Sequence, residues 1–283
     1  MTLAIITDGT VQFPNPVFEG RKHVTILPIV WDDGQGDKDS GQRKATDFPI
    51  SLINNKSPEF LANSSEVYRL HFERMAPLVD GILVINHASY INGNYINALA
   101  AAEEMQGKVP IRVVDSQNFS LAMGILVQAA AEQAEEIGNL AGLELVVRNL
   151  IPRIYTVLCI PGLSFIEKRN QVNHTQALVG EHLKMLPIFT MDQGELVHSE
   201  KARNKRHLVD ILHEFLTEFG ELEHISLLQG IPSFESETRA LRERLLEDHA
   251  ETSISEQNIS GQMASVIGPH SLGVFALQRE FSS

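Results

Sequence analysis

The sequence predicts an α/β protein of two domains, the first with a parallel sheet and the second with a mixed or antiparallel sheet. Two observations predict this fold class. In the first half of the chain, short apolar runs alternate with segments whose apolar residues recur at helical spacing. After about residue 155, paired extended runs and separate helical segments replace this alternation. We therefore predict a first domain over residues 1–155 and a second, α+β domain over residues 156–283.

Four apolar runs in the first half are predicted to be strands covered on both faces, because they are nearly continuous in Val, Ile and Leu. They are residues 3–7, 24–30, 81–86 and 111–115. Helical patterns occupy residues 66–79 and 120–138. Strands that alternate with helices form a parallel sheet with helices on both faces. Residues 32–60 begin as a polar stretch rich in turn formers, so we expect a surface excursion there.

The second half shows a different order of elements. Residues 186–202 contain two extended runs joined around Asp192-Gln193-Gly194, which predicts a hairpin. A helix is expected over about residues 207–218. Further elements are an apolar run at 224–230, a charged helix containing 239–248, an alternating run at 251–259 and an apolar run from residue 273. Antiparallel strands with helices of this kind indicate an α+β domain.

Composition excludes several classes of function. The chain of 283 residues has a formal net charge of −13, which argues against binding to the nucleic-acid phosphate backbone or to an anionic membrane surface. No apolar run approaches the roughly 20 residues of a membrane-spanning helix, and the start of the chain has no signal-peptide pattern. We therefore expect no stable membrane insertion and a cytoplasmic location. Cys159 is the single cysteine and lies in an apolar run, so a buried thiol is expected.

Asp8-Gly9-Thr10 follow the first predicted strand, as they would in a haloacid-dehalogenase phosphatase. Those enzymes use an aspartate two residues before this triplet as the nucleophile. Ile6 occupies that position here, and an alkyl side chain cannot attack phosphorus. The segment therefore keeps the sequence of such a loop without its chemistry.

Polar segments follow three predicted strands, where ligands of open parallel sheets bind. They are residues 7–10, 86–95 and 115–118. The middle segment is the most informative, because small polar residues around Gly93 precede a predicted helix and expose backbone N–H groups to an anion. Ordinary N-capping of that helix by Asn92 or Asn94 is the alternative explanation.

The order of these segments resembles the DegV family of bacterial fatty-acid-binding proteins over nearly the whole chain. "ITDGT" matches the family's strand followed by Thr-Asp-Ser, and Asn63-Ser64 match its Thr-Ser pair. "ASYINGNYINA" mirrors the loop Ser-Ser-x-Leu-Ser-Gly-Thr-Tyr-x-x-Ala, with Asn92 and Asn94 in place of Ser and Thr. "VVDSQNFSLAMGILVQAA" matches the Asp-Ser strand end and the helix after it.

The second half continues the resemblance. "LSFIEKRNQV" is similar to Leu-x-x-Leu-x-x-Gly-Gly-Arg-Ile, with Gln171 in the place of the Arg. "EKARNKRHLV" fits the Lys-x-Arg segment through Lys201 and Arg203. "VIGPHSLGVFAL" fits the terminal Gly-x-His strand through Gly268 and His270.

This resemblance implies a DegV-like fold with a Rossmann-like first domain, and a lipid site between the two domains. It implies a protein without catalytic activity that holds a long-chain fatty acid and presents the carboxylate to a fatty acid kinase. The residues expected to bind the carboxylate are Asn63, Ser64, Asn92, Gly93, Asn94, Arg203 and His270. No metal or other cofactor is expected.

A hydrocarbon tail requires a long, dry tunnel, for which two segments offer apolar walls. The candidate residues are Leu121, Met123, Ile125, Leu178, Leu183 and Leu186. Gly124 and Gly180 would leave room for the chain to pass. The alternative for each of these residues is that it packs in an ordinary core.

Two other functions stay open at this point. A DegV-like protein with so many amides in its head-group loop could bind a different amphiphile. A phosphatase or hydrolase could use Asp8, Asp115 and His87, although no recognised nucleophile elbow, phosphate loop or metal motif is present in the sequence.

Overall fold

The computed structural model describes residues 2–33, 38–248 and 251–280. These residues divide into two compact units, each of which is described by itself. The first unit comprises residues 1–41, 60–152 and 193–195, and the second comprises residues 42–59, 153–192 and 196–283. The main division thus falls between residues 152 and 153. Residues 42–59, part of the expected surface excursion, group with the second unit instead of the first.

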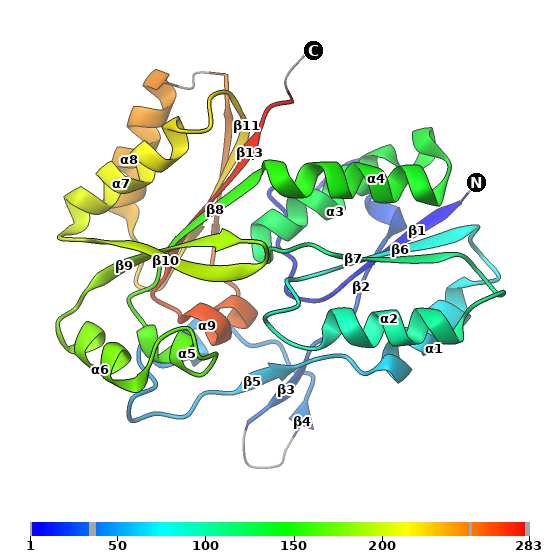
Figure 1. Cartoon of the computed structure of the whole chain (residues 1–283), viewed down its shortest axis with the longest axis horizontal. Coiled ribbons are helices and arrows are strands. Elements are labelled where there is room, and N and C mark those ends of the chain that lie inside the picture. The colour runs from blue at the N-terminus through cyan, green and yellow to red at the C-terminus, as the bar shows by residue number, and fades with distance from the viewer. Residues whose placement is uncertain (1, 34–37, 249–250, 281–283) are drawn as a thin grey trace. The chain divides into compact units, whose positions relative to one another are not determined.

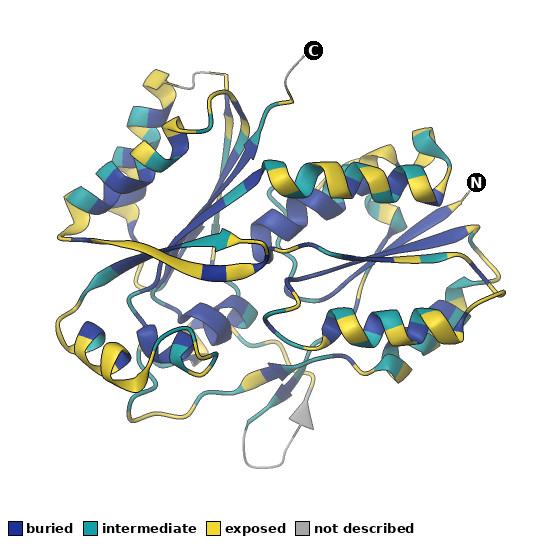
Figure 2. Cartoon of the chain, viewed as in Figure 1, coloured by how far each residue is buried: buried dark blue, intermediate teal, exposed yellow. Residues whose placement is uncertain are grey.

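The first unit is built on a four-stranded parallel sheet of order β2-β1-β6-β7 (Figure 1). Its strands are β1 (Leu3–Thr7), β2 (Val24–Ile26), β6 (Gly81–Asn86) and β7 (Ile111–Asp115). The residues of β1 and β6 are all buried, as expected for strands with helices on both faces (Figure 2). A three-stranded sheet contains β3 (Val30–Asp32), β4 (Lys38–Asp39) and β5 (Glu59–Leu61).

Four helices cover the parallel sheet. They are α1 (Ser65–Met75), α2 (Asn94–Glu104), α3 (Ser120–Ile137) and α4 (Leu140–Leu150). The helices α1 and α2 lie on one face, where Tyr68, Phe72 and Ala98 pack against Ile6 and Val84. The helices α3 and α4 lie on the other face (Figure 1). The apolar face of each helix is thereby removed from water, which is the main stabilising contribution of this layered arrangement.

The expected strand over residues 24–30 is wrong in its extent, because the structure divides it into β2 and β3, which belong to different sheets. Leu27 N–H still donates to the Thr7 carbonyl, but Pro28 follows. Proline has no N–H and a fixed φ, so it does not continue a ladder. The chain leaves the parallel sheet at this residue.

The second unit contains a six-stranded mixed sheet of order β10-β9-β8-β13-β11-β12. Its strands are β8 (Ile154–Cys159), β9 (Leu186–Asp192), β10 (Glu195–Ala202), β11 (Leu222–Gln229), β12 (Ser253–Asn258) and β13 (Leu272–Gln278). The predicted hairpin is present as β9 and β10, with Gln193 and Gly194 both at positive φ. Strand β12 runs parallel to β11, since α8 forms the crossover between them.

Five α-helices accompany this sheet. They are α5 (Leu163–Glu167), α6 (His174–His182), α7 (Lys205–Thr217), α8 (Glu235–Asp248) and α9 (Gly261–Ile267). Residues of α7 and α8, among them Leu208, Leu212 and Leu241, form one apolar core with Val157 and Val274 of the sheet. Cys159 is in the same core, and burial raises the pKa of its thiol, so it is an inert packing residue. Three short 3₁₀ helices, η1 (Arg21–His23), η2 (Ala45–Asp47) and η3 (Ile151–Arg153), complete the described elements.

A histidine joins the edge strand β12 to β11. His224 Nδ1 lies 2.6 Å from Ser253 Oγ, and His224 Nε2 lies 2.9 Å from both Ser226 Oγ and Ser255 Oγ. A neutral imidazole satisfies this set, because one ring nitrogen donates and the other accepts. Burial lowers the pKa of His224. The neutral form is therefore the one that the fold selects.

We predict that the free energy of unfolding falls as the pH drops below about 6.5, the ordinary pKa of histidine. The unfolded chain takes up a proton in that range, whereas folded His224 resists it, so acid favours unfolding. The prediction is checked by urea unfolding of the wild type and His224→Asn across this pH range. The variant is expected to show a shallower pH dependence, and an unchanged slope would contradict this role of His224.

Candidate functional site

The carboxyl ends of β1, β6 and β7 meet at one edge of the parallel sheet (Figure 1). Asp8 follows β1, His87 follows β6, and Ser116 follows β7. All three side chains are fully or almost fully buried. Polar groups in such a position must find hydrogen-bond partners within the protein, since burying them unpaired is costly.

Asp8 is the centre of this polar cluster. Its Oδ1 accepts from Thr10 N at 3.0 Å and from Thr10 Oγ1 at 2.6 Å, and its Oδ2 accepts from His87 N at 2.8 Å. Asn86 Nδ2 approaches Oδ2 at 3.4 Å and donates to Tyr68 Oη at 2.7 Å. Burial, and then the negative charge of Asp8, raise the pKa of Tyr68. The Asp8 carboxylate therefore holds together the loop that follows β1 and the loop that follows β6.

The residues of the alternative phosphatase have separate structural partners. His87 Nδ1 donates to the Ala88 carbonyl at 3.0 Å, and Asp115 accepts from Ser89 N at 3.2 Å and Gln117 N at 2.8 Å. Asp8 contacts the backbone of His87 and not its ring. No described contact joins these three side chains into an acid, base and nucleophile.

Asn94 ties the loop after β6 to the segment before α1. Its side chain is 2% exposed. Its Nδ2 donates to His87 Nε2 at 3.2 Å, and its Oδ1 accepts from Asn63 N at 2.7 Å. Asn97 Nδ2 adds a bond to the Asn63 carbonyl at 2.8 Å. Both ends of the Asn94 side-chain amide are thus occupied, and its backbone N–H donates to Asn92 Oδ1 at 3.0 Å, so Asn94 supports the loop and leaves no donor for an anion.

Asn92 presents the opposite situation. Its Oδ1 accepts from Asn94 N at 3.0 Å, whereas its Nδ2 is buried and has no hydrogen-bond partner among the described residues. Native proteins rarely leave such a donor unpaired, and a missing ligand is one of the few explanations. The neighbouring Gly93 is exposed. The loop thus offers an unused amide donor beside an accessible backbone.

Ser64 is exposed and is the N-cap of α1. Its Oγ accepts from Val67 N at 3.4 Å. A hydroxyl that accepts in this way still has its own hydrogen to donate. The capping role and the predicted carboxylate contact are therefore compatible.

In the second unit, His270 is half-buried and fixed in orientation. Its Nδ1 donates to the Pro232 carbonyl at 2.9 Å, and its ring stacks on Phe234 with 4.7 Å between the ring centroids. The pKa of His270 lies below its ordinary value, mainly because the ring is partly buried. The hydrogen bond to the Pro232 carbonyl offsets part of this shift, and the positive charge of Lys205 adds to it. The ring nitrogen Nε2 is left for a ligand.

Arg203 follows β10 and is exposed. Its backbone N–H donates to His207 Nδ1 at 3.1 Å, in the turn where Asn204 caps α7. The turn fixes the backbone of Arg203, and its guanidinium lies on the surface of the second unit.

A cavity of about 540 Å³ lies within the second unit, next to α5, α6, β9 and β10. This volume falls in the range of pockets for small ligands. The residues that line it include Leu163, Gln171, Val172, Val179, Met185 and Phe189. Polar groups, His198 among them, complete the lining. The wall is thus mainly apolar, as a hydrocarbon requires.

The predicted tunnel residues occupy other positions. Leu178 and Leu183 are exposed, at 43% and 64%. Leu186 packs against the core of the sheet. Leu121, Met123 and Ile125 are buried on α3, and none of the six side chains lines the cavity of the second unit. Their role as a tunnel stays a prediction.

Gly124 packs against the backbone and leaves no room for a chain, whereas Gly180 lines the cavity of the second unit. A Cβ at Gly124 would lie 1.9 Å from the Gln12 carbonyl oxygen, and a Cβ at Gly180 would lie 2.4 Å from Leu163 Cδ1. Both glycines therefore permit close packing of protein on protein. At Gly180 this contact brings α6 onto α5 and forms one wall of the cavity.

The helix α5 links the cavity to the segment that carries His270. Leu163 of α5 lines the cavity, and Phe165 packs beside Gly268, two residues before His270. The sequence pattern did not identify Val172, Val179 or Met185 as wall residues. The available signal was the small pair Ala177 and Gly180, the buried residues of α6.

A family model described as "Uncharacterised protein, DegV family" matches residues 2–279. The chain belongs to the DegV family. A DegV domain-containing protein of Clostridium perfringens is 25% identical over 279 residues, covering 95% of each chain. One of Caldanaerobacter subterraneus is 28% identical over 226 residues, covering 78% of this chain and 80% of the relative.

Solved DegV structures share the fold. A DegV family protein of Thermus thermophilus, described as fatty acid binding, is 23% identical with a TM-score of 0.81, covering 99% of this chain and all of that one. The Fatty Acid Kinase (Fak) B3 protein of Streptococcus pneumoniae, loaded with linoleic acid, is 16% identical with a TM-score of 0.82 at the same coverage. The predicted DegV-like fold, with a parallel and a mixed sheet, is confirmed.

Two amides distinguish this DegV protein from the family pattern quoted above. Asn92 brings the unpaired Nδ2 to the predicted head-group loop, and Gln171 lines the cavity of the second unit where the family has an arginine. Among the described residues, no group of three or more His, Cys, Asp or Glu side chains is arranged to hold a metal. No helix in the described ranges is both long enough and apolar enough to cross a membrane.

Proposed function

We propose that this DegV protein binds a long-chain fatty acid without chemical change and presents its carboxylate to a fatty acid kinase. The observation that carries the proposal is the apolar cavity of about 540 Å³ in the second unit. A tail that enters it gains about 0.8 kcal/mol for each buried methylene. Ordering and association offset part of this gain, so a long tail is needed for useful affinity.

The carboxylate needs donors that replace its lost water. The candidates with a free donor are Asn92 Nδ2, the Ser64 hydroxyl and the backbone at Gly93. His270 and Arg203 are the candidates from the second unit. Asp8 and Asn94 support the loops and do not contact the ligand in this proposal. The carboxylate-binding residues that we propose are therefore Ser64, Asn92, Gly93 and His270, with Arg203 as an exposed contact.

The proposal is tested by native mass spectrometry of the purified protein, followed by extraction and identification of any lipid. One long-chain fatty acid per chain supports it. Incubation of that complex with a bacterial fatty acid kinase and ATP then reveals whether acyl phosphate forms. Protein that neither retains nor takes up any fatty acid would overturn the proposal.

A second candidate function is the binding of a different amphiphile. Asn92 and Gln171 favour it, because amides present both a donor and an acceptor where the family pattern has a hydroxyl and a guanidinium. A neutral polar head group, such as an amide or an alcohol, would pair with them. Recovery of such a lipid by the same extraction would select this candidate.

We predict that fatty-acid affinity falls as the pH rises above about 6.5. A carboxylate is attracted by protonated His270 and not by the neutral ring, whose Nε2 carries a lone pair. Since burial already lowers the pKa of His270, binding must take up a proton in this range, which weakens affinity by at most about tenfold per pH unit. Titration of the wild type and His270→Gln between about pH 6 and pH 8 checks this.

The His270→Gln variant is expected to bind more weakly at low pH and with little pH dependence. His213→Gln is the matched control, since His213 pairs with Asp248 on the α7–α8 side of the second unit. Equal pH dependence in wild type and His270→Gln would remove His270 from the site.

A further inference from the structure

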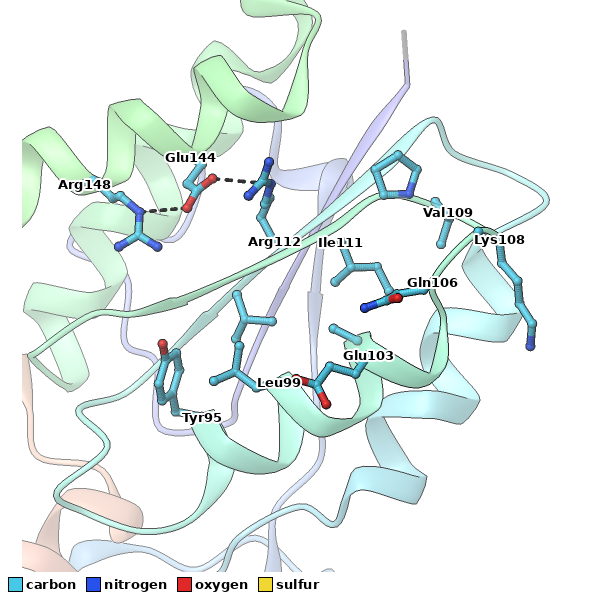
Figure 3. A pocket seen from close by; sticks show the side chains of 14 residues that line it. Tyr95, Leu99, Glu103, Gln106, Lys108, Val109, Ile111, Arg112, Glu144 and Arg148 are labelled. Atoms are coloured by element: carbon cyan, nitrogen blue, oxygen red, sulfur yellow. Dashed lines mark hydrogen bonds and ion pairs between the residues drawn. The ribbon is translucent and has the colours of Figure 1, made fainter.

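A groove of about 660 Å³ runs along β7 in the first unit, between α2 and α4 (Figure 3). Within the described residues, the parallel sheet ends at β7. The groove shares no lining residue with the cavity of the second unit or with the proposed carboxylate donors. Its function is therefore a separate question from fatty-acid binding.

The backbone N–H and C=O groups of alternate residues in β7 point toward the groove. Ile82 N donates to the Pro110 carbonyl, and Ser116 N donates to the Asn86 carbonyl, in the register that pairs Ile82 with Ile111. In a parallel ladder of this register, even-numbered residues of β7 bond to β6, and Ile111 and Val113 direct their N–H and C=O groups outward. Such an edge is the template on which an extended peptide adds as a strand.

The two walls of the groove differ in chemistry. On the α2 side, Tyr95 and Leu99 lie next to Ile111 and Val113. The partly buried Tyr95, Leu99 and Ile111 and the buried Val113 form an apolar stretch of this wall, and Glu103 of α2 also lines the groove.

The α4 side is basic. Arg112 Nε lies 3.6 Å from Glu144 Oε2, and Arg148 Nε lies 2.7 Å from Glu144 Oε1 (Figure 3). The two arginine side chains are 58% and 51% exposed, whereas Glu144 is 16% exposed. One carboxylate thus serves two guanidinium groups, and the wall carries a net positive charge in a chain whose net charge is −13.

We propose that this groove binds an extended segment of a partner protein in which apolar and acidic residues alternate. Successive side chains of a strand point to opposite faces. A segment paired with β7 would therefore place every second side chain against Tyr95 and Leu99, and the others against Arg112 and Arg148. Backbone hydrogen bonds to Ile111 and Val113 supply affinity, and the two walls select the sequence.

The test selects peptides from a random phage-displayed library on the wild-type protein, at about 0.15 M salt to screen the acidic remainder of the surface. We expect the enriched peptides to alternate apolar and acidic residues. The best peptide, made synthetically, is then measured by fluorescence anisotropy against Arg112→Gln/Arg148→Gln, Leu99→Glu and the control Arg206→Gln, an exposed arginine of the second unit.

The double arginine variant is expected to bind about tenfold more weakly, from two exposed charge contacts. Leu99→Glu should weaken binding as well, and Arg206→Gln should match the wild type. Retained fatty-acid binding and thermal stability identify variants that fold. The proposal would be overturned if no peptides with alternating apolar and acidic residues were enriched. It would also be overturned if the peptide bound the folded double variant as tightly as the wild type.

Discussion

Replacing Asp8 with alanine is expected to lower the free energy of unfolding by about 3–5 kcal/mol. The change leaves three buried donors without their acceptor: Thr10 N, Thr10 Oγ1 and His87 N. Each unpaired buried donor costs about 1–3 kcal/mol, and partial rearrangement of the loop reduces the sum. Urea unfolding monitored by circular dichroism measures the loss.

Asp8→Asn is the informative companion variant. Its remaining oxygen still accepts from Thr10, but its NH₂ group faces the His87 N–H, so an intermediate loss is expected. Asp192→Ala, at an exposed position, should change stability by less than about 0.5 kcal/mol. If Asp8→Ala is as stable as the wild type, the carboxylate does not support the loops, and its catalytic interpretation returns.

Replacing Met185 with tryptophan is expected to weaken fatty-acid binding by about 1–3 kcal/mol, or roughly 5–150-fold. Met185 lines the cavity and lies beside Gly180. A larger ring keeps the wall apolar but removes volume from the proposed tail site. Binding is measured by titration of delipidated protein with a long-chain fatty acid.

Leu183→Trp is the matched control, because Leu183 is two residues away and 64% exposed without lining the cavity. It should bind as the wild type does. Equal weakening by both substitutions would point to a general effect on α6. Unchanged affinity of a folded Met185→Trp protein would place the tail elsewhere.

Local pattern was sufficient for most of the fold. The Val- and Ile-rich runs became the parallel strands β1, β6 and β7, and the hairpin formed at Gln193-Gly194. One feature depended on tertiary context. Residues 42–59 group with the second unit through contacts that are distant in sequence, such as Leu52 N to Ser164 Oγ at 2.8 Å.

The candidate site was less accessible to sequence reasoning. Residue type suggested that Asn92 and Asn94 were equivalent donors, but only the structure distinguishes the occupied amide of Asn94 from the unpaired Nδ2 of Asn92. The apolar residues of α6 were expected to face a tunnel. Leu178 and Leu183 face outward instead, because the small residues Ala177 and Gly180 bring α6 close to α5.

Calorimetric titration of the delipidated protein at several temperatures measures whether the chain holds one long-chain fatty acid. We expect one site per chain, with a negative heat-capacity change because apolar surface is buried, and a weaker site in Met185→Trp. Absence of binding would contradict the proposed function, and so would binding that does not saturate at one fatty acid per chain.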